Sequence, residues 1–235
     1  MKSELAMIII TLAATCLPAI GQGDNIATAD GANLNSSDDS GRVGASSDSG
    51  PEVLDEYDAV SAEDIQDLVE KGQMFAVRGN YRDSIRAFDR AAGLDPKNAS
   101  IRVAKGNALS LDLARYNESI LAYDAAIQID PKDADAWAGK GDALASIGRR
   151  EEAISAYSTA IEIDPKSAGA WRGKGDAMRK SGDLEGALKA YDRAIRVDPL
   201  DAGAWKGKSI ALQALDRDSD AYDARVEARE LGISI

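Results

Sequence analysis

The feature that most constrains the fold is a short unit that recurs along the chain. The dipeptide Asp-Pro begins at positions 95, 130, 164 and 198, at intervals of 35, 34 and 34 residues. Trp137, Trp171 and Trp205 follow the same interval of 34. A fixed period in this range is typical of arrays in which each unit buries its apolar face against its neighbours. We therefore predict a linear stack of similar units.

The pattern inside one unit is helical. Ala153, Tyr157, Ala160 and Ile161 recur every three or four residues, which places them on one apolar stripe of a helix. Pro165 follows this stripe, and it ends a helix because it lacks an amide donor and disfavours helix at the residue before it. Small residues elsewhere in the unit allow two helices to approach closely. Each unit is thus predicted to be a pair of packed helices.

These residues resemble the tetratricopeptide repeat, a 34-residue helix-turn-helix unit with aromatic, small and proline residues at set positions. With Ala134 as position 1, the matching residues are Trp137 at 4, Gly141 at 8, Ala153 at 20, Tyr157 at 24, Ala160 at 27 and Pro165 at 32. The resemblance implies an all-α fold, a right-handed α-superhelix (TPR solenoid) of five helix-turn-helix repeats. It places the repeats at 65–98, 99–133, 134–167, 168–201 and 202–235, within a domain spanning 61–235. The Ala-Trp-x-Gly-Lys-Gly segments also resemble exported repeat proteins of methanogenic archaea.

The chain departs from the family pattern at position 7, where leucine is usual and all five repeats have lysine. We expect the aliphatic stems to pack while the ammonium groups reach water, and a lysine ladder that binds anions is the alternative. The last repeat has Ser209 at position 8 and Arg225 at position 24, which indicates a terminal cap. The five lysines are Lys71, Lys105, Lys140, Lys174 and Lys208.

Two segments precede the repeats. Residues 1–21 are predicted to be a secretory signal peptide, because Lys2 precedes an apolar run that ends near the small-residue site Ala19-Ile20-Gly21. An uncleaved leader that anchors the protein to a membrane is the alternative. Residues 22–60 are predicted to be a disordered acidic linker rich in Gly, Ser and Asp, with nine acids and one base. The expected location is extracellular or at the cell envelope.

Composition excludes several classes of function. The formal net charge of -12 argues against a nucleic-acid partner, which needs an excess of Lys and Arg. The chain has no histidine, and its one cysteine, Cys16, lies in the predicted leader, so Ser-His-Asp and Cys-His mechanisms are excluded. Segments 216–227 and 202–209 approach a calcium loop and a phosphate loop, but each lacks an essential glycine. We predict no enzyme activity, no metal and no cofactor.

The remaining candidate is the groove that this family forms from positions 2, 5, 9, 12 and 13 of its first helices. The resemblance implies a protein or peptide partner. At the basic end of the groove, one interpretation of Arg172, Arg179 and Lys206 is a fork that binds an acidic or C-terminal carboxylate group, and a solvated set of charges is the alternative. A self-associating or tethering component of the cell envelope is the alternative function, and the sequence leaves the oligomeric state open. The predicted groove residues are Val69, Gln73, Val103, Asn107, Asp142, Arg172, Asp176, Arg179, Lys180 and Lys206.

Overall fold

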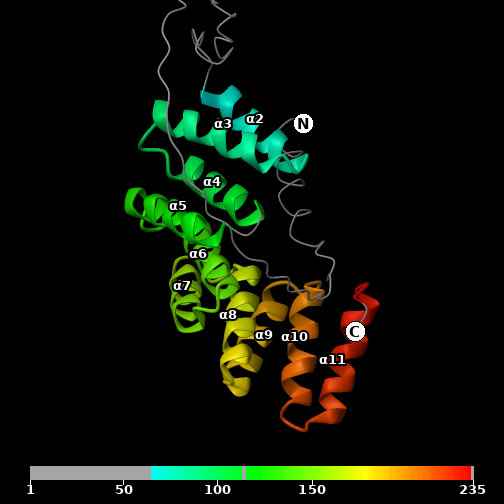
Figure 1. Cartoon of the computed structure of the whole chain (residues 1–235). Coiled ribbons are helices and arrows are strands. Elements are labelled where there is room, and N and C mark those ends of the chain that lie inside the picture. The colour runs from blue at the N-terminus through cyan, green and yellow to red at the C-terminus, as the bar shows by residue number, and fades with distance from the viewer. Residues whose placement is uncertain (1–64, 113–114, 234–235) are drawn as a thin grey trace, which may run out of the picture. The chain divides into compact units, whose positions relative to one another are not determined.

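The computed structural model describes residues 65–112 and 115–233, and these residues form ten α-helices (Figure 1). No strand occurs within these two ranges. The predicted signal peptide and linker, residues 1–21 and 22–60, lie outside them. The helices are α2 (Ile65–Val77), α3 (Tyr81–Leu94), α4 (Ala99–Leu111), α5 (Tyr116–Ile129), α6 (Ala134–Ser146), α7 (Arg150–Ile163), α8 (Ala168–Ser181), α9 (Leu184–Val197), α10 (Ala202–Gln213) and α11 (Asp218–Glu230).

Consecutive helices pack in pairs, α2 with α3 through to α10 with α11. In each pair we call the first the A helix and the second the B helix. Each A helix after α2 also packs against the B helix of the preceding pair, so the pairs stack in chain order. The predicted all-α solenoid of five helix-turn-helix repeats is confirmed.

The A helices form the inner side of the stack. Each contacts the A helix of the next repeat, as α4 does with α6, whereas the B helices in the described ranges make no comparable contacts with one another. Helices on the inside of a curved stack are the more crowded ones. The inner surface is therefore made by α2, α4, α6, α8 and α10, and the B helices form the outer surface.

The two markers of the period meet in one joint between repeats. The backbone N–H of Asp130 donates to the carbonyl of Ala126 at the end of α5, and its carboxylate accepts a hydrogen bond of 2.9 Å from the amide of Lys132. The carbonyl of Pro131 then accepts a hydrogen bond of 3.1 Å from the indole Nε1 of Trp137 in α6. Equivalent bonds of 3.0 Å join Trp171 to Pro165 and Trp205 to Pro199.

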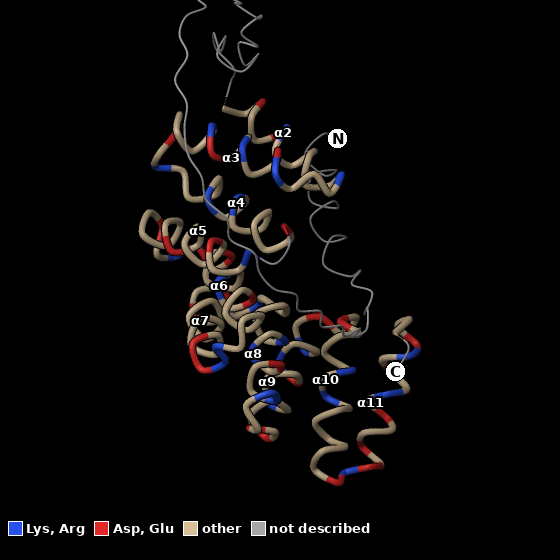
Figure 2. Tube along the Cα trace, in the orientation of Figure 1, with Lys and Arg blue, Asp and Glu red and all other residues tan. Residues whose placement is uncertain are grey.

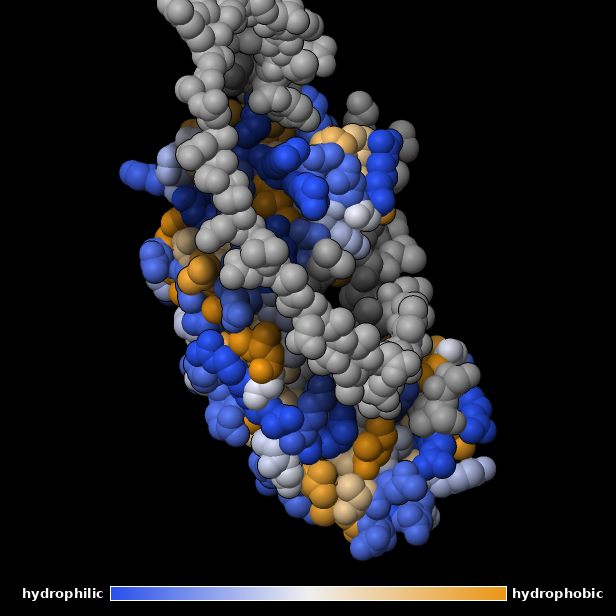
Figure 3. All heavy atoms as spheres, in the orientation of Figure 1, coloured by the Kyte–Doolittle hydropathy of each residue, from blue (hydrophilic) through white to orange (hydrophobic). Residues whose placement is uncertain are grey.

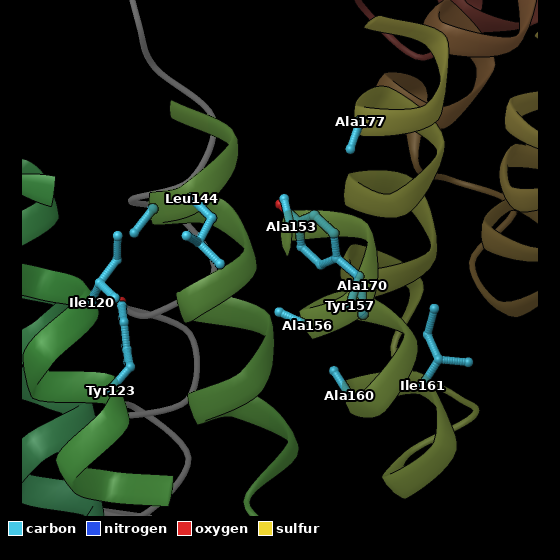
Figure 4. Close-up of a cluster of buried hydrophobic side chains, with 11 residues drawn as sticks. Ile120, Tyr123, Leu144, Ala153, Ala156, Tyr157, Ala160, Ile161, Ala170 and Ala177 are labelled. Carbon is cyan, nitrogen blue, oxygen red and sulfur yellow. The ribbon is translucent and has the colours of Figure 1, made fainter. Parts of the chain in front are cut away.

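The core consists of small residues around a few large ones. Ala153, Ala160 and Ala170 are at most 1% exposed and lie around Tyr157, which is 2% exposed (Figure 4). Alanine at these sites lets the helices approach closely, and the aromatic ring fills the remaining space. This packing positions the tyrosine hydroxyls of the B helices toward the inner surface.

The surface is mostly polar. Polar and charged residues cover most of the described surface that Figure 3 shows, with apolar residues in smaller patches between them. None of the helices in the described ranges combines the length and the apolar character needed to cross a membrane.

Candidate functional site

A row of polar side chains runs along the inner surface, and each is held by a tyrosine of the same repeat. In the second, third and fourth repeats the tyrosine at position 24 of the B helix donates its hydroxyl to the side chain at position 9 of the A helix. Position 9 is one of the predicted groove positions. The pairs are Tyr123 with Asn107 at 2.6 Å, Tyr157 with Asp142 at 2.6 Å and Tyr191 with Asp176 at 2.8 Å, each to Oδ1.

Glycines on two A helices make room for each tyrosine ring. A Cβ atom on Gly141 would lie 2.7 Å from Cε1 of Tyr157, and a Cβ atom on Gly173 of the next repeat would lie 2.6 Å from the same atom. Real Cβ atoms do not approach a ring so closely, so both positions require glycine while the tyrosine is present. The paired glycines of the Gly-Lys-Gly segments thus let a hydroxyl from the outer layer reach the inner surface.

The glycine at position 8 belongs to the repeat pattern and was predicted, whereas the need for glycine at position 6 was not. The sequence does contain a signal for it. Position 6 is glycine in the three repeats that follow a tyrosine at position 24, whereas Ala104 holds it after Phe88. The residue at position 6 of one repeat therefore indicates whether the preceding repeat has tyrosine or phenylalanine at position 24.

The tyrosine hydroxyls of this row are protonated near neutral pH and act as donors, and burial raises their pKa further. Burial raises the pKa of Tyr123 to about 12, and it also raises the pKa of Tyr157 and Tyr191. The surrounding protein partly desolvates the carboxyl of Asp142 and raises its pKa, although Tyr157 and the charge of Arg172 act in the opposite direction. The row combines fixed acceptors with hydroxyl donors that do not ionise near neutral pH.

Arg172 joins two A helices. Its Nη1 lies 2.8 Å from Oδ1 of Asp201, which is only 9% exposed and also accepts a hydrogen bond of 3.0 Å from the amide of Ala204 at the start of α10. Burial lowers the pKa of the Arg172 guanidinium, but the charge and hydrogen bond of Asp201, together with the charges of Asp176 and Asp142, outweigh it and the net shift is upward. Arg172 is therefore a fixed, neutralised cation.

Arg179 is held in a similar way. Its Nε donates to the hydroxyl oxygen of Tyr191 at 3.2 Å, and its Nη2 lies 3.5 Å from Oδ1 of Asp176. Two members of the expected carboxylate fork thus have acidic partners of their own. Within the described ranges, Lys180 and Lys206 have no carboxylate within ion-pair distance, so both are unneutralised cations of this region.

The first two repeats contribute fewer charged side chains to the inner surface than the later repeats do. Val69 in α2 and Val103 in α4 are half-buried and pack against the core. Gln73 in α2 and Asn107 in α4 are exposed. Part of the apolar surface of the first two A helices is therefore used in packing.

Three of the lysines at position 7 form ion pairs with the preceding B helix. Lys140 Nζ lies 2.6 Å from Asp124 of the preceding B helix and 5.4 Å from the ring centroid of Trp137. Lys105 with Asp89 and Lys208 with Asp192 repeat the ion pair at 2.5 and 2.7 Å. These pairs link successive repeats.

The two segments that were compared with a phosphate loop and a calcium loop lie largely in helices. Segment 202–209 is the first part of α10, and α11 begins at Asp218, within the segment compared with a calcium loop. Asp220 is paired with Arg217 at 2.6 Å. In the described ranges, no group of three or more acidic, histidine or cysteine side chains is arranged to hold a metal ion.

Comparisons with known proteins agree with this architecture. Two family models described as tetratricopeptide repeat match the chain, one at residues 69–110 and 109–168 and the other at 148–211. No curated protein sequence matches significantly.

Solved structures share the fold at low sequence identity. MamA from Desulfovibrio magneticus RS-1 has a TM-score of 0.64 and 19% identity, covering 72% of this chain and 96% of its own. Pseudomonas aeruginosa pilF has a TM-score of 0.67 and 16% identity, covering 73% and 78%. YrrB, described as a TPR protein with an unusual peptide-binding site, has a TM-score of 0.57 and 17% identity, covering 72% and 87%. With its five helix pairs and its family matches spanning 69–211, the chain belongs to the tetratricopeptide repeat family.

Proposed function

We propose that this protein is a non-enzymatic scaffold that binds a peptide or an extended protein segment along the inner surface of its A helices. The observation that carries the proposal is the row of position 9 side chains held by tyrosine hydroxyls. A groove whose polar groups are already fixed loses little side-chain entropy on binding. It therefore suits a ligand that needs several aligned hydrogen bonds.

The relatives support this class of function. Tetratricopeptide arrays present extended concave surfaces that bind other proteins. YrrB, which shares the fold, is described as having an unusual peptide-binding site. A preformed groove of this size is expected to bind a short peptide with an affinity on the order of micromolar.

The charges favour a ligand with an acidic side chain or a C-terminal carboxylate at the α8 and α10 end. Lys180 and Lys206 are unneutralised cations there, and Arg172 keeps donors beyond the one that binds Asp201. An arginine already fixed by a buried aspartate is pre-oriented for a second carboxylate. We further propose that the protein acts outside the cell, on the strength of the signal predicted at residues 1–21.

Peptide binding to the full chain tests the proposal. Fluorescence anisotropy would compare labelled peptides of equal length that are acidic, basic or neutral, each with a free and an amidated C-terminus. We expect the acidic peptides, and those with a free terminus, to bind best. The double variant Lys180→Glu, Lys206→Glu should weaken their binding by about tenfold or more, since two attractive charges become repulsive.

The matched control is Lys132→Glu, Lys166→Glu, which makes the same charge change on exposed lysines in turns between repeats. This control should bind the peptides as the wild type does. Equal weakening by both double variants would show that net charge alone governs binding, and no binding of any peptide class would refute the proposed function.

A further inference from the structure

Two B helices carry stripes of opposite charge at the same repeat positions. Positions 22, 26 and 29 lie on one face of a helix, because they are spaced by four and three residues. All six side chains at these positions are exposed, and Figure 2 marks the charges along the two helices. The basic stripe on α9 is Lys189, Arg193 and Arg196, and the acidic stripe on α11 is Asp223, Glu227 and Glu230.

These stripes are specific to the last two repeats. The same three positions combine basic, apolar, neutral polar and single acidic residues in the earlier repeats. The corresponding residues are Arg86, Arg90 and Gly93 in α3, Leu121, Ala125 and Gln128 in α5, and Ser155, Thr159 and Glu162 in α7. A uniform charge at all three positions is therefore not a requirement of the repeat fold.

None of the six stripe residues forms an ion pair within the described part of the chain, although ion pairs surround them. Asp192 on α9 is paired with Lys208, and Asp220 on α11 is paired with Arg217. The stripes have no such partner. Their charges remain available to a second molecule.

Each stripe borders a hollow on the outer surface. The basic stripe borders an open hollow of about 440 Å³ between α8 and α9, with Trp171 and Met178 in its lining. Lys174 adds a further cation there. The lysines of the second, third and fifth repeats pair with an aspartate at position 25 of the preceding repeat, but the residue at that position before Lys174 is Ser158. Asp223 and Glu227 line the neighbouring hollow of about 420 Å³.

We propose that the occupant of this surface is a second copy of the same chain, bound through α9 and α11 around a two-fold axis parallel to the two helices. Such a dimer must use the same patch on both molecules. A patch with a basic half beside an acidic half is complementary to itself, since the rotation places each half over the opposite one. With the two helices at equal height, Lys189 would face Asp223 of the second copy. Arg193 would then face Glu227, and Arg196 would face Glu230.

The charges favour a second copy over an unrelated partner. The two stripes have three charges each, with the same spacing and opposite sign, so one molecule supplies the complement of the other. The surface lies on the B helices and leaves the inner surface of the A helices open. The dimer is therefore compatible with peptide binding and is independent of it.

Charge exchange tests the dimer. Sedimentation velocity of the full chain in low salt should show association that increases with concentration, with a dissociation constant on the order of 100 µM for a small interface of exposed ion pairs. The triple variant Lys189→Glu, Arg193→Glu, Arg196→Glu should be monomeric, and so should Asp223→Lys, Glu227→Lys, Glu230→Lys. Circular dichroism would show that each variant keeps its helices.

The two triple variants should associate with each other when mixed, because one has only acidic stripes and the other only basic ones. The six-residue variant that exchanges both stripes should regain self-association. A wild type that stays monomeric in low salt, or a mixture that stays monomeric, would overturn the dimer. Fluorescence anisotropy with the labelled peptides distinguishes the dimer from the proposed peptide binding. The stripe variants should still bind peptides on the inner surface whether or not they dimerise.

Discussion

The ring of Tyr191 lies so close to the backbone of Gly207 that a Cβ atom on Gly207 would be 2.4 Å from Cε1 of the ring. Tyr191 belongs to α9 and Gly207 to the A helix of the next repeat. Their contact therefore sets how closely two repeats can stack. The same contact allows the Tyr191 hydroxyl to reach Asp176 on the inner surface.

Gly207→Ala is expected to destabilise the protein by about 1–3 kcal/mol, because the added methyl group must displace an aromatic ring buried between helices. Gly169→Ala is the matched control, since nothing lies within 4 Å of its Cβ position in α8. That control should be neutral or stabilising by up to about 1 kcal/mol through helix propensity. Urea denaturation of the two variants checks this, and equal stabilities would contradict the close contact.

The double variant Tyr191→Phe, Gly207→Ala should lose less stability than the sum of its two single changes. The first two repeats already show a phenylalanine at position 24 followed by alanine at position 6, in Phe88 and Ala104. Loss of the hydroxyl removes one of the atoms that the new methyl group meets. A double-mutant cycle measures the coupling, and strict additivity would show that the hydroxyl and the added methyl group do not compete for space.

Asp142→Asn should change how stability depends on pH. The pKa of the Asp142 carboxyl is raised in the folded state from a reference value of 3.8, so the folded protein holds this proton more tightly than the unfolded chain does. Stability from this group is then gained as pH falls through the folded pKa toward 3.8, and ionised Asp142 is a relative cost above that range. Asparagine can still accept the hydrogen bond of Tyr157, as Asn107 does from Tyr123.

The midpoint of thermal unfolding, measured from pH 3 to pH 7, checks this. Relative to the variant, the wild type should lose stability as pH rises through the window, and the two curves should run parallel above it. A wild type that instead gains stability relative to Asp142→Asn as pH rises would mean that Tyr157 and Arg172 together lower the pKa of Asp142 more than desolvation raises it.

The repeat and its helices could be predicted from the sequence because their causes recur every 34 residues. Proline follows the first four B helices, alanine marks the close contacts, and tryptophan marks each A helix from Trp137 onward. The partners of the inner-surface charges could not be predicted in this way. Arg172 meets Asp201, 29 positions away, and a register pattern does not reveal which of several nearby acids a long side chain will reach.

Asp201 combines two roles that substitutions can separate. Its carboxylate caps α10 through the amide of Ala204 and also holds Arg172. Asp201→Asn should keep the cap and lose the ion pair, whereas Asp201→Ala should lose both and cost about 1–3 kcal/mol. Asn should also strengthen binding of an acidic peptide, because it leaves Arg172 without its neutralising charge. Denaturation and peptide anisotropy measure the two effects, and weaker peptide binding by Asp201→Asn would show that Arg172 needs this aspartate for its orientation.

Ser158→Asp should supply the ion pair that the junction between the third and fourth repeats lacks. Ser158 occupies position 25 in α7, where Asp124 and Asp192 bind the lysine of the next repeat at 2.6 and 2.7 Å. An aspartate there would face Lys174, and a partly exposed pair of this kind contributes about 0.2–1 kcal/mol. The control Ser155→Asp adds the same charge to an exposed site of the same helix.

Because the new pair is electrostatic, the difference in unfolding midpoint between Ser158→Asp and Ser155→Asp should be largest in low salt and nearly vanish in 1 M salt, where the screening length is about 3 Å. Ser158→Asp should also weaken self-association, since it neutralises one cation beside the basic stripe, and Ser155→Asp should do so less. A midpoint that falls equally in both variants would show that Lys174 does not turn toward position 158. The register of the other junctions would then not extend to this one.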